Sequence, residues 1–200
     1  MGGTTHLDKL DLGDGAGALT FAGSAFKRSN MVRYTNPIAA ELISIVADVS
    51  MANGAQTIAA QPDFPRKLQV RITDADSSVS AGIVTIVGTD PSGNAVSEAV
   101  ALTGGTATKK TANAFSHVTS ATISALAGNA GADHISIGVA ADLGLPGHGN
   151  PVPGSFAVYK SNVSNGDQAV GTVDAVAGTI SPTTAPDATK AYDFWYTFTA

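Results

Sequence analysis

Residues 83–102 read IVTIVGTDPSGNAVSEAVAL, two strand-like runs on either side of a turn. The turn at residues 90–94 contains Pro, Gly and Asn, which favour the backbone angles of a hairpin loop. The first run is β-branched on both faces, and the second places Val96 and Val100 among small or polar residues. The pattern predicts a β-hairpin whose first strand is covered on both faces by another sheet or by another subunit.

The same period of two recurs along most of the chain. It predicts further strands at residues 43–49, 68–72, 115–126, 134–139, 156–160, 170–176 and 192–199. Turn residues separate these runs at a spacing of roughly 8–12 residues, which is typical of sandwiches and barrels. The chain is therefore predicted to be all-β, an antiparallel β-sandwich or barrel-like domain with an extended N-terminal arm.

Changes in composition predict three parts. Residues 1–36 are rich in Gly, Ala and Thr with scattered Leu and Phe, which indicates an extended arm. Residues 37–145 hold the main β-sandwich domain. The stretch LGLPGHGNPVPG at 143–154 is a stiff connector by composition. Residues 146–200 are then a Gly/Pro linker and C-terminal β-strands, which complete the sandwich or form a small second β unit.

Composition also argues against several classes of protein. The net charge is −5 and only 14% of residues are charged, against about 25% in an average globular protein. Direct binding to nucleic acid needs a basic stripe that the chain lacks. The chain has no cysteine, which excludes disulfides and thiolate metal sites. No secretory signal and no apolar run near twenty residues are visible, so a membrane-spanning helix is not expected.

Catalytic patterns are missing from the sequence. It contains no G-x-S-x-G motif, and its four histidines are not spaced as metal ligands on one strand or helix. Asp74 and Asp76, close to Arg71, are explained as turn residues at a strand end. We expect no enzyme activity, no catalytic residues, no metal and no cofactor.

Two groups of residues are candidates for contact with other chains. The basic group Arg66, Lys67 and Arg71 either docks on an acidic neighbouring subunit or is a charged strand edge that discourages aggregation. The aromatic residues of the last strand place one apolar face opposite Trp195, either deep in a sheet or in an interface. The complete set of expected interface residues is Leu19, Phe21, Phe26, Arg66, Lys67, Arg71, Tyr192, Phe194, Trp195, Tyr196 and Phe198.

Several segments together resemble the β-sandwich structural proteins of tailed phages and prophages. They are TIAAQPDFPRKLQVRIT at 57–73, VTIVGTDPSGNAVSE at 84–98, FSHVTSATI at 115–123, IGVAADLGL at 137–145 and the aromatic end at 194–196. The resemblance covers residues 37–200 and rests on fold and composition, without an invariant chemical motif. The Gly-rich arm is a departure from it. No catalytic residue is implied.

The resemblance implies a virion structural protein, and we expect a capsid decoration (cement) protein that stabilises the assembled head. A tail-tube or head-to-tail connector subunit is an alternative, and a carbohydrate- or cell-surface-binding module that uses Trp195 is a second. The expected partners are the major capsid protein or other virion subunits, and a homo-oligomer, a trimer or dimer. The expected location is the phage particle, assembled in the host cytoplasm.

Overall fold

The structure, a computed structural model, describes residues 27–130, 132–147, 157–163 and 171–199. Within these residues the chain is all-β, as expected, and contains no helix. The strands are β1 (Lys27–Thr35), β2 (Val46–Ser50), β3 (Gly54–Gln56), β4 (Arg66–Thr73), β5 (Ala81–Thr89), β6 (Ala95–Ala101), β7 (Ala107–Phe115), β8 (His117–Ala127), β9 (His134–Gly144), β10 (Ala157–Val163), β11 (Thr172–Asp174), β12 (Thr179–Ser181) and β13 (Ala191–Thr199).

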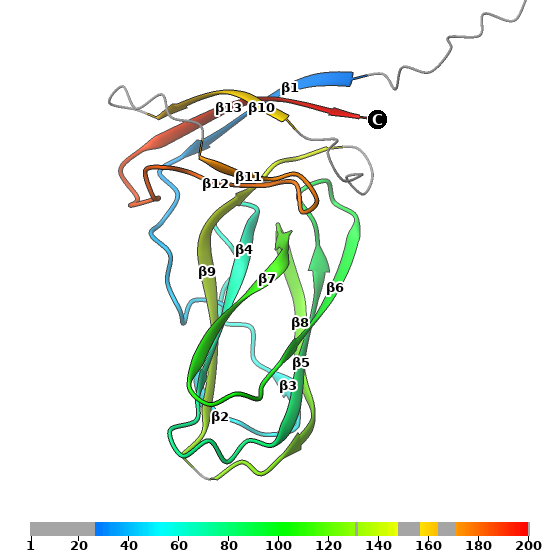
Figure 1. Cartoon of the computed structure of the whole chain (residues 1–200), viewed down its shortest axis with the longest axis vertical. Coiled ribbons are helices and arrows are strands. Elements are labelled where there is room, and N and C mark those ends of the chain that lie inside the picture. The colour runs from blue at the N-terminus through cyan, green and yellow to red at the C-terminus, as the bar shows by residue number, and fades with distance from the viewer. Residues whose placement is uncertain (1–26, 131, 148–156, 164–170, 200) are drawn as a thin grey trace, which may run out of the picture.

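Three antiparallel sheets arise from these strands. Sheet A has the order β1-β13-β10, sheet B has the order β11-β12-β9-β4-β7 with β2 also paired to β9, and sheet C has the order β3-β8-β5-β6. Sheets B and C face each other as a sandwich, and sheet A lies across one end of it, above β11 and β12 (Figure 1). The predicted hairpin at residues 83–102 is confirmed, because Ile83 pairs with Ala101 and Thr89 with Ala95. Among the described residues, however, only one face of its first strand is buried, not both.

The sandwich core comes from the alternation predicted in the sequence. Along β4 the residues at even positions are buried and those at odd positions are not, and β5 follows the same parity. Since successive side chains of a strand point to opposite faces, each sheet lines the core with every second residue. The central contributors are Leu68, Val70, Ile72, Val84, Ile86, Ile123, Ile135 and Ile137.

A second core lies between sheet A and the end of β9. The inner face of sheet A pairs Val32 with Phe194 and Tyr34 with Tyr192, and these rings pack against Leu143 and Leu145. Tyrosine hydroxyls donate hydrogen bonds to nearby carbonyls, Tyr34 to Gly144, Tyr192 to Ala185 and Tyr196 to Pro146. Burial raises the pKa of Tyr34 and raises that of Tyr196 to about 12, so both phenols stay protonated donors at neutral pH.

Strand pairings cross the boundaries that composition predicted. Residues 27–35 belong to the predicted arm, but they form β1 and pair with β13 along their whole length. Residues 1–26 lie outside the described residues, so the arm remains a prediction for them. The C-terminal part does two things: β12 pairs with β9 and extends sheet B, while β10 and β13 build sheet A with β1.

The guanidinium of Arg66 is buried inside the fold. Its side chain is fully buried, with Nε donating to the carbonyl of Ala140 at 2.7 Å and Nη1 to the carbonyl of Ile38 at 2.9 Å. Nη1 also pairs with Asp63 at 3.0 Å. The three acceptors lie in β9, in the crossing from sheet A to sheet B, and in the loop before β4. One side chain therefore ties three separate segments together.

Replacing Arg66 with alanine should destabilise the fold strongly. The change leaves buried carbonyls and Asp63 without their partner, and such losses cost about 3–5 kcal/mol. Urea unfolding followed by circular dichroism measures the effect. Arg71→Ala, on the same strand but exposed, is the matched control and should change stability by less than about 0.5 kcal/mol. Equal losses from the two variants would contradict the role given to Arg66.

Candidate protein interface

Within the part of the chain that the structure describes, the outer face of sheet C contains no Asp, Glu, Lys or Arg. Because β5 buries its even positions, its odd positions and their cross-strand partners face outward. We define the C face by these residues: Ala55, Ala81, Ile83, Thr85, Val87, Thr89, Ala95, Ser97, Ala99, Ala101, His117, Ser120, Thr122, Ser124 and Ala127. His117, at one end, is its only titratable side chain. Ile83 is 40% exposed and is the largest apolar group presented there.

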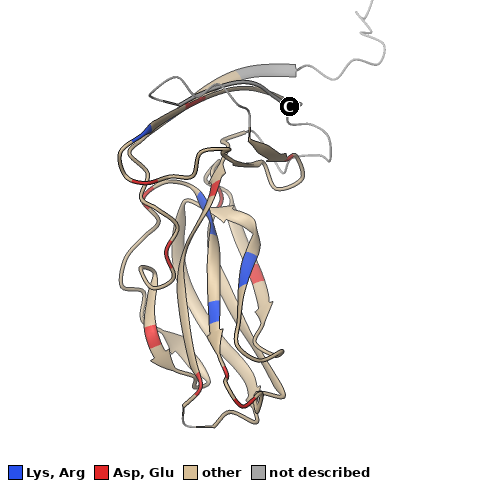
Figure 2. Ribbon diagram, turned by 60° about the vertical axis from the view of Figure 1, so that its left-hand side comes forward, with Lys and Arg blue, Asp and Glu red and all other residues tan. Residues whose placement is uncertain are grey.

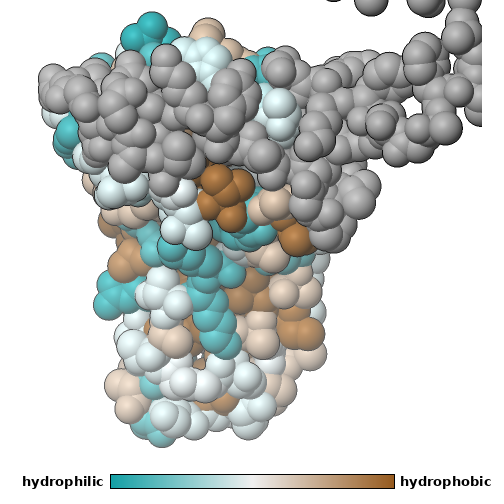
Figure 3. Space-filling model, turned by 45° about the horizontal axis from the view of Figure 1, so that its top comes forward, coloured by the Kyte–Doolittle hydropathy of each residue, from teal (hydrophilic) through white to brown (hydrophobic). Residues whose placement is uncertain are grey.

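The outer face of sheet B has the opposite character. It carries Lys67 and Arg71 on β4 and Lys110 on β7. Two of these cations have partners, since Lys67 reaches Asp174 at 2.9 Å and Lys110 reaches Asp142 at 2.8 Å. Figure 2 shows how few charged positions the ribbon carries, with basic ones along the sandwich strands. The side of the molecule in Figure 3 mixes hydrophilic and hydrophobic groups.

Part of the sheet B face is also covered by the chain itself. The amides of Glu41 and Ile45 donate to the carbonyls of Val139 and Ile137, each at 2.9 Å. A Cβ added at Gly138 would lie 2.0 Å from the carbonyl oxygen of Glu41, so the covering segment needs glycine at this point of β9. The C face is thus the broad sheet face left uncharged among the described residues.

The edges of the sandwich are closed by side chains. Glu98 on β6 points inward and accepts hydrogen bonds from the amides of Ala112 and Asn113 on β7, and Lys109 donates to the carbonyls of Ala101 and Thr103. Free strand edges attract other strands, and inward charges are one way to block them. These contacts make addition of a strand at the β6 and β7 edges unfavourable.

The edge of β8 is closed in another way. β3 covers only three of its residues. Beyond them the side-chain amide of Gln61 both donates to and accepts from the backbone of Val118, at 3.0 and 2.7 Å. On the other side of β3, Asn53 accepts from the amide of Leu126. The two side chains replace a neighbouring strand, and sheet C is left with its face, not its edges, available for contact.

Glu98→Ala should open the β6–β7 edge. The amides of Ala112 and Asn113 lose a charged acceptor, which costs about 1.5–3 kcal/mol where the site is sheltered and less where water replaces the carboxylate. Thermal unfolding, combined with light scattering to detect association through the edge, provides the measurement. Ser97→Ala, the next residue but on the C face, should leave the melting temperature nearly unchanged. A wild-type melting curve for Glu98→Ala would contradict this assignment.

The expected interface residues fall into different places. Arg66 is buried and Lys67 is bound to Asp174, so only Arg71 of the basic group is exposed and without an ion-pair partner among the described residues. Tyr192, Phe194 and Tyr196 are buried inside the second core. Trp195 lies half-buried on the outer face of sheet A opposite Met31, which is 54% exposed.

Four of the expected residues receive no side-chain description. Leu19, Phe21 and Phe26 lie outside the described residues, and Phe198 is placed in β13 by its backbone alone. The sequence predicted a cover on both faces of the strand at residues 83–87, but it did not single out the C face as a whole, although a signal was present. The odd positions of 83–102 and the Ser/Thr run at 119–124 contain no charge.

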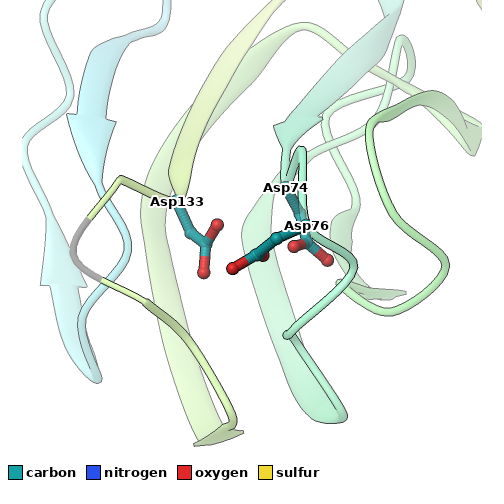
Figure 4. A group of neighbouring side chains, drawn as sticks. All are labelled: Asp74, Asp76 and Asp133. Carbon is teal, nitrogen blue, oxygen red and sulfur yellow. The ribbon is translucent and has the colours of Figure 1, made fainter.

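Asp74, Asp76 and Asp133 form the acidic cluster that comes nearest to a metal site. Each offers one oxygen, all within 4.8 Å of one another, and the three side chains converge between the turn after β4 and the start of β9 (Figure 4). Asp74 accepts from the amides of Ser78 and Val79, and Asp133 from that of Ala130. Hydrogen bonds from Ser78 hold the pKa of Asp76 below its usual value. The carboxylates of Asp74 and Asp133 therefore accept hydrogen bonds from backbone amides of the loops at this end of the sandwich, which is a structural role.

The ion pairs of sheet B make stability depend on pH. Burial raises the pKa of Asp142, but hydrogen bonds from Lys110 and Ser181 outweigh it and hold the pKa below the ordinary 3.8. A hydrogen bond from Lys67 likewise lowers the pKa of Asp174. A carboxyl group whose folded pKa is depressed contributes stability above its unfolded pKa and loses it as the pH falls.

We therefore expect stability to be level near neutral pH and to decline as the pH falls below about 4. Asp142→Asn removes one of the groups responsible, so its unfolding free energy should vary less with pH in this range. Lys110→Met should act in the same direction, because it removes the main partner of Asp142. Urea midpoints at several pH values test this, and an unaltered slope in both variants would argue against the assignment.

Comparison with protein-family models finds no match to the chain, and comparisons with curated proteins and with solved structures find none either. Among the described residues, no helix is long and apolar enough to cross a membrane.

Proposed function

We propose that this chain is a structural subunit of a tailed-phage particle, a capsid decoration protein that stabilises the assembled head through protein–protein contacts. The observation that carries the proposal is the C face, an exposed four-stranded surface without Asp, Glu, Lys or Arg. A face of this kind can be covered by another protein without removing ions from water, which is the main cost of burying a charged surface. The phage setting rests on the sequence resemblance.

The construction of the sandwich supports a role in assembly. Its edges are closed by Glu98, Lys109 and Gln61, which disfavours open-ended growth by strand addition. Controlled contact through faces is what a subunit of a closed shell requires. A protein that binds the assembled lattice but not its free subunits stabilises the lattice by mass action.

The location of the partner follows from this proposal. The major capsid protein would supply the surface that this chain binds. The chain would bind to assembled shells in the host cytoplasm. The half-buried position of Trp195 gives less support to the glycan-binding alternative, because stacking on a sugar needs an open ring face.

Quantitative mass spectrometry of purified particles from the strain that encodes the chain tests the proposal. We expect a copy number close to that of the major capsid protein, and particles made without the chain should release their DNA at a lower temperature. Adding back the purified chain should restore the wild-type temperature, since binding lowers the free energy of the assembled shell.

Two results would count against a decoration role. If mass spectrometry does not detect the chain in purified wild-type particles, the virion assignment is wrong. A copy number that is a small fraction of the capsid protein, together with rings formed by the purified chain, would favour the tail-tube or connector alternative. The control is the same particle preparation after mock addition of an unrelated β-sandwich protein.

A further inference from the structure

We propose that residues 7–14 of the N-terminal arm pair with the free edge of β1 in the same chain and close that edge against other strands. Residues 1–26 lie outside the described residues, whereas the backbone of the edge that would receive them is described along its whole length. The contact concerns the free chain, which it would keep from associating through β1. It goes beyond the proposed function and does not depend on it.

β1 is an edge strand of sheet A, and its outer edge pairs with no strand among the described residues. Just after β1 the amide of Asn36 donates to the carbonyl of Lys190, which continues the register between β1 and β13. Because backbone groups alternate in direction along an antiparallel pair, the even-numbered residues of β1 bond to β13 and the odd-numbered ones point outward. The outward amides and carbonyls belong to Ser29, Met31, Arg33 and Thr35.

This edge is less protected than the edges of the sandwich. Glu98, Lys109 and Gln61 close those edges with several hydrogen bonds to the backbone. On β1 the side chains that the structure describes close one backbone group, since Asn30 Oδ1 accepts from the amide of Met31 at 2.9 Å. A nine-residue edge that is closed at one amide is a template for another strand.

Charge indicates which segment covers this edge. β1 contains Lys27, Arg28 and Arg33 and no Asp or Glu, so a second copy of β1 would approach it with like charges. Residues 7–14 read LDKLDLGD, with three Asp against one Lys, and they hold all the acidic residues of the arm. Opposite charges at facing positions of two strands attract and like charges repel. The acidic segment of the arm therefore fits the basic edge strand.

One antiparallel register suits both faces of sheet A. It places Asp11 opposite Arg33, which is 61% exposed on the outer face. Arg33 holds Asp193 through Nε at 3.3 Å, and a guanidinium has further donors for a second carboxylate. In the same register Leu10 and Leu12 fall on the inner face, which is the apolar side of sheet A. The alternation of this segment is thus in phase with that of β1.

The covalent connection favours the chain's own arm over that of another copy. The twelve residues 15–26 join the acidic segment to the start of β1 and reach at most about 40 Å. β1 is about 30 Å long, so the connection can turn back along it. A short tether holds the segment at an effective concentration of about a millimolar, and the edge fills from its own chain before it meets another.

Paired cysteines test the contact in the full chain, which has no native cysteine. In this register Asp14 lies opposite Asn30 in a pair without mutual backbone hydrogen bonds, whose spacing suits a disulfide. We expect Asp14→Cys with Asn30→Cys to form a disulfide within one molecule under mild oxidation. Asp14→Cys with Thr108→Cys, whose second cysteine is exposed on β7, is the matched control and should oxidise at least about tenfold more slowly.

A charge reversal tests the same contact without cysteine. Asp11→Lys would face Arg33 with a like charge, so the amides of residues 30–35 should lose protection in hydrogen exchange, and light scattering should detect association through the opened edge. Asp48→Lys makes the same change of charge on β2 and should leave exchange in β1 as in wild type.

Three results would overturn the proposal. Disulfides that form mainly between two molecules would assign the edge to the arm of another copy. Equal oxidation of the two cysteine pairs would show that the arm has no preference for β1. Unchanged exchange of residues 30–35 in Asp11→Lys would show that the acidic segment does not cover the edge. Circular dichroism of each reduced variant establishes that it is folded.

Discussion

The buried guanidinium of Arg66 is the interaction that holds the segment between sheets A and B against β4 and β9. It bonds to β9 through Ala140, to the crossing segment through Ile38 and to the loop before β4 through Asp63. A charge this deep needs hydrogen-bond partners, and Nε and Nη1 find theirs in these three segments, whereas Nη2 has none among the described residues. The three segments therefore stabilise one another's positions. The end of the sandwich on which sheet A rests is thereby defined, and with it the side of the molecule that the chain covers itself.

Period-two alternation predicted the fold class and most strands, because one buried face per strand leaves that mark in any sandwich. It identified the β5–β6 hairpin and the core positions of β4. It also placed Arg66 on the same parity as Leu68 and Val70, a signal that the residue is buried, which the basic cluster Arg66, Lys67 and Arg71 obscured. Which strands pair could not be predicted, since β1 joins β13 and β12 joins β9 across long stretches of chain.

The candidate interface was harder to predict than the fold. Tyr192, Phe194 and Tyr196 showed an apolar face, but a single strand does not reveal whether its own chain or another covers that face. Here Tyr34, Leu143 and Leu145 cover it. The C face gave a weak signal for the opposite reason, because Ser, Thr and Ala are common on any strand and become distinctive only when four neighbouring strands are placed side by side.

The pairing of β1 with β13 puts the order of synthesis in conflict with the order of structure. Lys27 stands opposite Thr199, so β1 emerges from the ribosome more than 150 residues before its neighbour β13. At about 5–20 residues per second, β1 waits on the order of ten seconds or more for its neighbour. Sheets B and C can close their core during that interval, and sheet A then forms across a sandwich that is already folded.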